Sequence, residues 1–157
     1  MTPLLLISLL FGGVAPAAQT AWMTPERFHL ELGMSLAQAE AAIVHAGLVS
    51  KEGKEPGHRL VEVSEKRMIT LAFEDDCLTS IRFELVDFLP EIRTAWKEIV
   101  LRMFSAHGKP SRQTESPRTL VYEGGDPEIY IFASVEPKGA FGEQGLGFLV
   151  TRYVMSR

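Results

Sequence analysis

Two helix patterns, each followed by three strand patterns, constrain the fold more than any other feature of this chain. Ser35 and Gln38 form a capping box that predicts the start of the first helix, and Gly47 fits the position just past its end. Pro90 predicts the start of the second helix, which we expect to end at Gly108. Apolar residues recur at helical spacing through both segments, so each helix should bury one face.

Each helix pattern is followed by segments in which apolar and polar residues alternate, as in half-buried strands. The strand patterns lie at 59–64, 68–74, 78–86, 119–123, 128–135 and 146–155. Asp75-Asp76 predicts a tight hairpin between the second and third patterns. Short connections favour antiparallel pairing. We therefore predict an α+β fold with two helices on one face of an antiparallel sheet of roughly six strands, built as a degenerate α-β-β-β repeat.

The N-terminal segment is uncharged, and residues 4–14 are almost all apolar. Ala15-Pro16-Ala17 has the small-x-small pattern that signal peptidase accepts. These features predict a signal peptide at 1–17 and an exported protein, either periplasmic or secreted. No basic residue precedes the apolar run, so an uncleaved N-terminal anchor is the alternative. We expect residues 18–32 to form a linker and 33–157 to form a single α+β domain.

The composition and the net charge argue against some classes of binding partner and attachment. A net charge of −4 without a basic run argues against nucleic acid, which is bound through clustered Lys and Arg. Cys77 is the only cysteine, so there is no internal disulfide. It does not directly follow the leader, so we expect no lipid anchor. The simplest interpretation of Cys77 is a small buried side chain; the alternatives are an intermolecular disulfide and a reactive thiol.

Catalytic and metal-binding motifs are not found in the sequence, so we predict no catalytic residue, no metal and no cofactor. His29, His45, His58 and His107 are scattered, and none is paired at helical spacing. His45 and His107 fall in the last turns of the two helices, where a histidine complements the helix dipole. The acidic cluster Glu74-Asp75-Asp76 is interpreted as an exposed turn rather than a calcium site, because it lacks EF-hand spacing.

Aromatic residues gather in the C-terminal third of the chain, and five of them are the candidate binding residues: Tyr122, Tyr130, Phe132, Phe141 and Tyr153. Tyr130 and Phe132 share one face of their strand, opposite Ile129, Ile131 and Ala133. If the aliphatic set packs on the helices, the aromatic pair lies on an open sheet face, where such side chains are typical of interfaces. The alternative is a sheet that is covered on both sides.

Three short segments between residues 33 and 110 share a pattern with a known group. Gly33-Met34-Ser35 opens a helix, Phe73–Leu78 forms a hairpin, and Gly108-Lys109-Pro110 closes a helix. In these features the chain resembles the β-lactamase-inhibitor-like superfamily, which includes small lipoproteins of the outer-membrane barrel-assembly machinery. The resemblance implies helices on one side of an antiparallel sheet and a binding or scaffolding role. The lipid-bearing cysteine of those lipoproteins is absent, and here the helix start and the Gly-x-Pro closer belong to different helices.

The sequence thus predicts an exported, non-enzymatic binding or scaffolding protein. We expect it to contact another macromolecule, most simply a protein, through the open sheet face and the glycine-containing loop at 136–145. Two alternatives remain. A carrier of a small apolar ligand or lipid would have an apolar cavity, and a small exported hydrolase would have a deep pocket with convergent polar groups.

Overall fold

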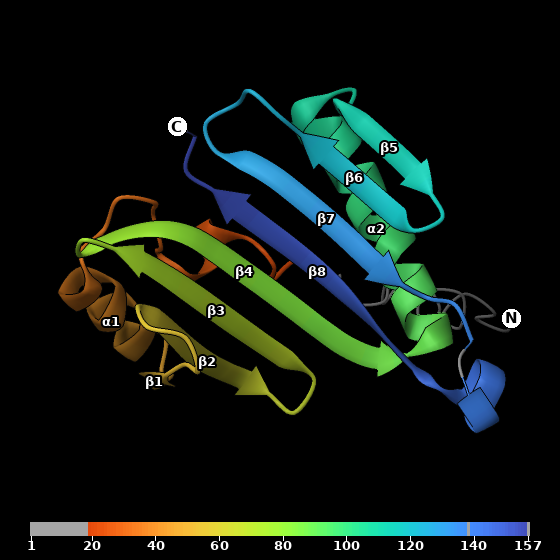
Figure 1. Cartoon of the computed structure of the whole chain (residues 1–157), viewed down its shortest axis with the longest axis horizontal. Helices are drawn as coiled ribbons and strands as arrows, with labels where there is room; N and C mark the ends of the chain where they lie inside the picture. The colour runs from red at the N-terminus through yellow and green to blue at the C-terminus, as the bar shows by residue number, and fades with distance from the viewer. Residues whose placement is uncertain (1–18, 138, 157) are drawn as a thin grey trace, which may run out of the picture.

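The computed structural model describes residues 19–137 and 139–156, and the predicted leader lies outside them. The chain forms one open antiparallel sheet of eight strands, and both α-helices lie behind it in Figure 1. The predicted α+β class is therefore confirmed. The elements are η1 (Pro25–Phe28), α1 (Leu36–His45), β1 (Ser50–Glu52), β2 (His58–Ser64), β3 (Arg67–Glu74), β4 (Cys77–Phe88), α2 (Leu89–His107), β5 (Arg112–Glu115), β6 (Arg118–Tyr122), β7 (Glu128–Ser134), η2 (Gly139–Gln144) and β8 (Leu146–Val154).

The sheet consists of two four-stranded halves that meet at β4 and β8, in the order β1-β2-β3-β4-β8-β7-β6-β5. Each half is a helix followed by four strands paired in sequence, so the repeat is α-β-β-β-β rather than the predicted α-β-β-β. The two extra strands, β1 and β5, are short and polar and form the edges of the sheet. Edge strands of this kind resist pairing with other chains.

Two sets of hydrogen bonds hold the start of α1, one within the helix and one from the β3–β4 turn. The Ser35 side chain accepts a hydrogen bond from the Gln38 N–H, and the Gln38 side chain accepts one from the Ser35 N–H, which confirms the capping box. The Asp76 carboxylate also accepts the Leu36 N–H at 2.9 Å. Asp75 and Asp76 have φ angles of 50° and 56°, as a tight hairpin requires. The acidic turn therefore holds the β3–β4 hairpin against α1.

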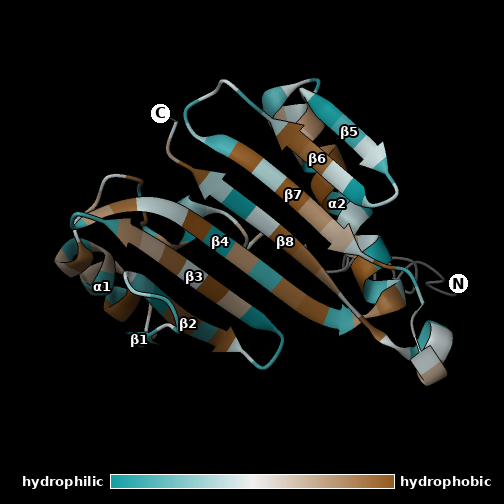
Figure 2. Ribbon diagram, viewed as in Figure 1, coloured by the Kyte–Doolittle hydropathy of each residue, from teal (hydrophilic) through white to brown (hydrophobic). Residues whose placement is uncertain are grey.

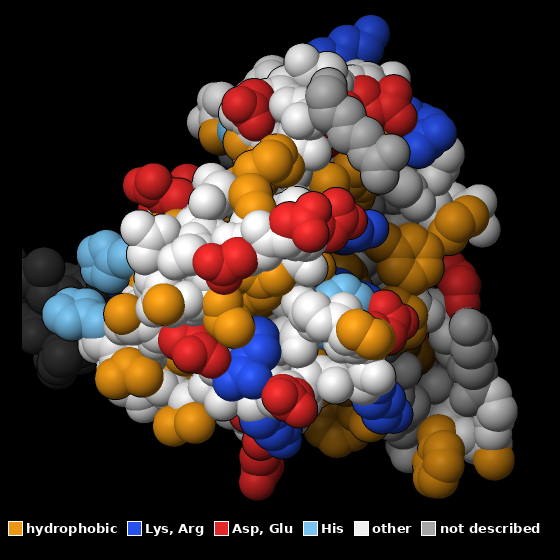
Figure 3. Space-filling view, turned by 60° about the vertical axis from the view of Figure 1, so that its left-hand side comes forward, with side chains coloured by type: hydrophobic (Ala, Val, Ile, Leu, Met, Phe, Trp, Pro, Cys, Tyr) orange, Lys and Arg blue, Asp and Glu red, His pale blue; other side chains and the backbone are white. Residues whose placement is uncertain are grey.

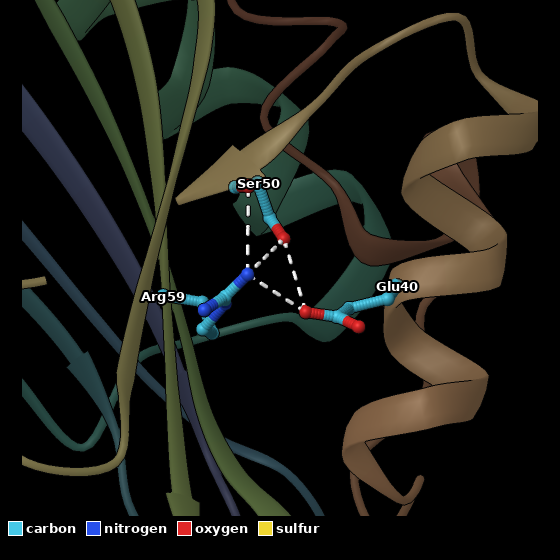
Figure 4. A network of polar contacts seen from close by, with 3 residues as sticks. All are labelled: Glu40, Ser50 and Arg59. Carbon is cyan, nitrogen blue, oxygen red and sulfur yellow. Dashed lines mark hydrogen bonds and ion pairs between the residues drawn. The ribbon is translucent and has the colours of Figure 1, made fainter. Parts of the chain in front are cut away.

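A polar network joins α1 to the edge of the sheet (Figure 4). The Arg59 guanidinium on β2 lies 2.8 Å from the Glu40 carboxylate on α1. The same nitrogen donates to the Ser50 hydroxyl on β1 at 3.1 Å. Arg59 has only 21% of its side chain exposed, so this ion pair is shielded from solvent more than an ordinary surface pair. It fixes α1 over β1 and β2.

The segment at 18–32 is not a linker, and that prediction is wrong for the described residues 19–32. Trp22, Met23, Phe28 and Leu30 are buried in the core. The Trp22 ring meets Phe83 of β4 edge-on, with ring centres 5.7 Å apart. The core therefore includes this N-terminal segment. Its short apolar stretch follows no helix or strand period, which is why the sequence pattern did not indicate burial.

The second helix, α2, packs across the sheet and supplies much of the core. It begins at Leu89-Pro90 and is capped by Gly108, as predicted. Its buried residues are Leu89, Ile92, Ala95, Trp96, Ile99 and Met103. Gly147 of β8 lies beneath its first turn, where an added Cβ would collide with the Ser134 carbonyl oxygen and the Leu89 side chain. The helix can thus approach β8 closely only at a glycine.

Candidate functional site

The face of the sheet opposite the helices carries an apolar strip along β4, β8 and β7. Strand register places its members on one face, because cross-strand partners point the same way. We call this set the open-face strip: Val86, Phe88, Tyr130, Phe132, Leu146, Phe148 and Val150. In Figure 2 the ends of β4 and β8 near η2 are largely hydrophobic in colour. No described helix or strand lies over this face in Figure 1.

The strip is most exposed at the end near η2. Phe88 and Leu146 are cross-strand partners and are 52% and 65% exposed. Next along the strip, the Phe132 and Phe148 rings lie 5.6 Å apart between centres. A contiguous run of partly exposed aromatic and aliphatic side chains is unusual on a monomer and is typical of an interaction surface.

Phe141 lies in η2, immediately before β8, and is 76% exposed. The loop that carries it is attached to α2 by Arg93. That guanidinium lies 2.6 Å from the Glu143 carboxylate and donates to the Val135 carbonyl oxygen at 3.1 Å. The hydrogen bond to Arg93 lowers the pKa of the Glu143 carboxyl. Arg93 thus ties the loop at 136–145 to α2 through Val135, just before the loop, and through Glu143 near its end, while Phe141 is left in solvent.

Two arginines lie side by side in the middle of the open face. Arg82 on β4 and Arg152 on β8 are direct cross-strand partners, an arrangement that is unfavourable for like charges. Arg82 is paired with Glu84 at 3.0 Å. Arg152 donates through Nε to the Ser80 hydroxyl at 2.9 Å and has no ion pair with any described residue. One positive charge in the pair is therefore uncompensated.

A hollow of about 450 Å³ lies next to these arginines. Its walls come from β2, β3, β4, β8 and the turn before β2, and they include His58, Thr70, Ser80 and a single carboxylate, Glu55. Figure 3 shows the α1 end of the molecule, where acidic, basic and apolar side chains are intermixed. The open face therefore combines an apolar end with a cationic centre.

The five aromatic residues predicted as a binding set do not form one surface. Tyr130 and Phe132 lie on the open face, as expected if Ile129 and Ile131 pack on the helices. Tyr122 and Tyr153 both pair with Ile129, so they lie on the helix face. Their grouping with Tyr130 was wrong.

Tyr153 is 6% exposed, and its hydroxyl donates to the Met23 carbonyl oxygen at 3.2 Å. Burial raises the pKa of Tyr153 to about 12. The Tyr122 hydroxyl donates to the Gly108 carbonyl oxygen at 2.9 Å, and burial raises the pKa of Tyr122 as well. Both tyrosines hold parts of the fold together rather than facing a partner.

Sequence reasoning missed Arg152 and the apolar end of β4 and β8. The alternation at 78–86 continues for two more residues, which would have placed Phe88 on the same face as Arg82. The pairing of β4 with β8 joins residues 58 to 74 positions apart and has no local signal. That pairing alone brings Arg82 beside Arg152 and Phe88 beside Leu146.

The histidines, the single cysteine and the acidic residues were also candidates for chemistry in the sequence. No group of three or more His, Cys, Asp and Glu residues there is arranged to hold a metal ion. His29 and His45 come together, with ring centres 5.8 Å apart, although the sequence had suggested four unrelated histidines. Cys77 is partly exposed rather than buried as predicted. Among the described helices, none is both long and apolar enough to cross a membrane.

Comparison with protein-family models, with curated proteins and with solved structures finds no match for this chain. The resemblance to the β-lactamase-inhibitor-like superfamily therefore stays a prediction.

Proposed function

We propose that this protein is an exported, non-enzymatic binding module that docks a protein partner on the open face of its sheet. The observation that carries the proposal is the composition of that face. It is apolar and exposed near Phe88 and Leu146, and at Arg152 it carries a positive charge that no ion pair with a described residue compensates, beside the Arg82–Glu84 pair. The partner that fits such a face has an apolar contact region beside an acidic one.

The apolar end would supply most of the binding free energy. Exposed aromatic and aliphatic side chains contribute little to the folded monomer, yet on association they lose their contact with water. Phe132 and Phe148 are already in contact, with their rings tilted by 43° to each other, so few rotatable bonds would be frozen when a partner covers them. Phe141 in the adjacent loop can extend this contact.

The arginines Arg82 and Arg152 would orient the bound partner. A like-charge cross-strand pair destabilises the free protein, and a partner carboxylate placed between Arg82 and Arg152 would relieve that repulsion. Such a contact would speed association and make it sensitive to salt. The resemblance noted for residues 33–110 supports the same class of function.

The experiment is affinity capture from the exported fraction of the producing cell, with mass spectrometry to identify what binds. Two variants probe the face: Phe132→Ser removes an apolar anchor, and Arg152→Glu reverses the uncompensated charge. Leu101→Ser is the matched control, because Leu101 is an apolar side chain with 72% exposure on α2, behind the sheet.

We expect one protein with an acidic surface to be captured by the unmodified protein and by Leu101→Ser. Its capture should be lost with Phe132→Ser and should fall with added salt or with Arg152→Glu. Equal capture by all variants would refute the proposal, as would a captured protein lost only with Leu101→Ser. Melting curves of each variant identify any loss that is due to unfolding.

A further inference from the structure

A second hollow, of about 440 Å³, lies on the helix side of the sheet and has no part in the open face. It is bounded by the N-terminal segment around η1, by the last turns of α2 and by residues of β7 and β8. Its floor is apolar and buried, formed by Leu30, Met103, Ile129 and the ring of Tyr153. The volume and the apolar floor are those of a site for a small molecule.

One positively charged side chain, Arg102, lines this hollow, and one of its nitrogens has no hydrogen-bond acceptor among the described residues. Its Nη1 donates to the Thr20 hydroxyl at 2.9 Å. Its Nη2 is buried and has no hydrogen-bond acceptor among the described residues. A guanidinium stays charged at any ordinary pH, and leaving one of its donors buried without an acceptor is unfavourable.

The natural partner of Arg102 is already occupied. Glu98 lies one turn earlier on α2, at the spacing that favours an ion pair. Its carboxylate instead accepts the N–H groups of Gln19 and Thr20 and the Thr20 hydroxyl. Arg102 therefore reaches only a neutral hydroxyl, and no described carboxylate lies within ion-pair distance of it.

The rim of the hollow carries the remaining charges. Glu26, Glu31 and Asp126 are exposed there, together with His107. Three carboxylates at the mouth would repel a ligand with several negative charges. They would tolerate a single carboxylate that enters past them and reaches Arg102.

We propose that this hollow binds an apolar molecule with one carboxylate, whose head group forms an ion pair with the Arg102 guanidinium and whose body rests on Leu30, Met103 and Ile129. Two sources share this chemistry: a medium-chain fatty acid and the free C-terminus of an apolar peptide. The site is on the opposite side of the sheet from the open-face strip. A result for this site therefore neither supports nor refutes the proposed docking function.

Isothermal titration of the folded, full-length protein tests this with two matched pairs of probes. Octanoate is compared with octanol, and the tripeptide Ala-Leu-Leu with its C-terminal amide. The variants are Arg102→Gln, which removes the charge, and Ala106→Trp, which narrows the hollow without changing charge. Ala106 lines the hollow and is exposed, so the protein should fold with tryptophan there. Arg82→Gln on the open face is the control.

We expect at least one carboxylate probe to bind about tenfold or more tightly than its neutral counterpart, as for a hydrogen bond to a charged group. Arg102→Gln should abolish that difference, Ala106→Trp should weaken binding of the acid, and Arg82→Gln should change nothing. The pair that shows the difference identifies the source. Equal binding of acid and neutral probe, no binding of either acid, or unchanged binding by both pocket variants would overturn the proposal.

Discussion

Replacing Trp96 by alanine should strongly destabilise the fold. Trp96 is 5% exposed and lies in the middle of the buried face of α2, between that helix and the sheet. Removing a large aromatic side chain from such a position leaves a cavity and loses its transfer free energy, at a cost of about 3–5 kcal/mol. For a domain of this size the melting temperature changes by about 3 °C for each kcal/mol, so Tm should fall by about 9–15 °C.

The assay is urea unfolding followed by far-ultraviolet circular dichroism, since Trp96→Ala also removes part of the fluorescence signal. Leu101→Ala on the same helix is the control, because Leu101 is 72% exposed and its truncation should change the unfolding free energy by about 0.5 kcal/mol or less. If the two variants unfolded with similar free energies, α2 would not pack against the sheet as described.

Three further changes test the packing around this core. Burial raises the pKa of Tyr153 to about 12 in the folded protein. The neutral phenol therefore contributes its full share to the free energy of unfolding below about pH 10, and this share is lost as the pH rises toward 12. The loss amounts to about 3 kcal/mol. Urea unfolding from pH 9 to 12 should show this loss in the unmodified protein but not in Tyr153→Phe; parallel curves would contradict it. Gly147→Ala should destabilise more than Gly124→Ala in thermal melts, since only the first added Cβ meets backbone and helix atoms; the reverse order would count against the close approach of α2 to β8. Glu98→Ala should expose residues 19–32 to limited proteolysis while the sheet stays protected, because it removes the acceptor of the Gln19 and Thr20 N–H groups; unchanged cleavage would mean that this contact does not hold the segment.

Local chemistry could be predicted from the sequence wherever neighbouring residues determine it. The Ser35–Gln38 capping box, the Asp75-Asp76 turn and the Gly108 cap all depend on residues only a few positions apart. Each was identified because its side chains bond within the same turn or adopt a backbone angle that few residues tolerate.

The segments that the sequence analysis missed or assigned wrongly are those whose structure depends on residues far away in the chain. β1 and β5 are too short and too polar to show alternation, and they exist because β2 and β6 offer free edges. Residues 19–32 are buried because Trp22 meets Phe83, about 60 positions later. No periodic pattern in the segment itself records such a contact.

The residues of the candidate site divide in the same way, into those that the local sequence pattern placed and those whose position depends on distant strand pairing. The alternation in β7 correctly separated Tyr130 and Phe132 from Ile129 and Ile131. Assigning Tyr153 to the same face failed, because its strand register against β4 and β7 decides which way it points. The cationic centre could not be predicted at all, since it exists only through the β4–β8 pairing.

Photo-cross-linking from the open face tests the central claim most directly. A benzophenone amino acid would replace Phe132 in one version of the protein and Leu101, on the helix side, in another. After irradiation in an extract of the producing cell, we expect one discrete protein adduct from position 132, weakened by added salt, and none from position 101. Adducts of equal yield from both positions, or from position 101 alone, would contradict the assignment of the open face as the docking surface.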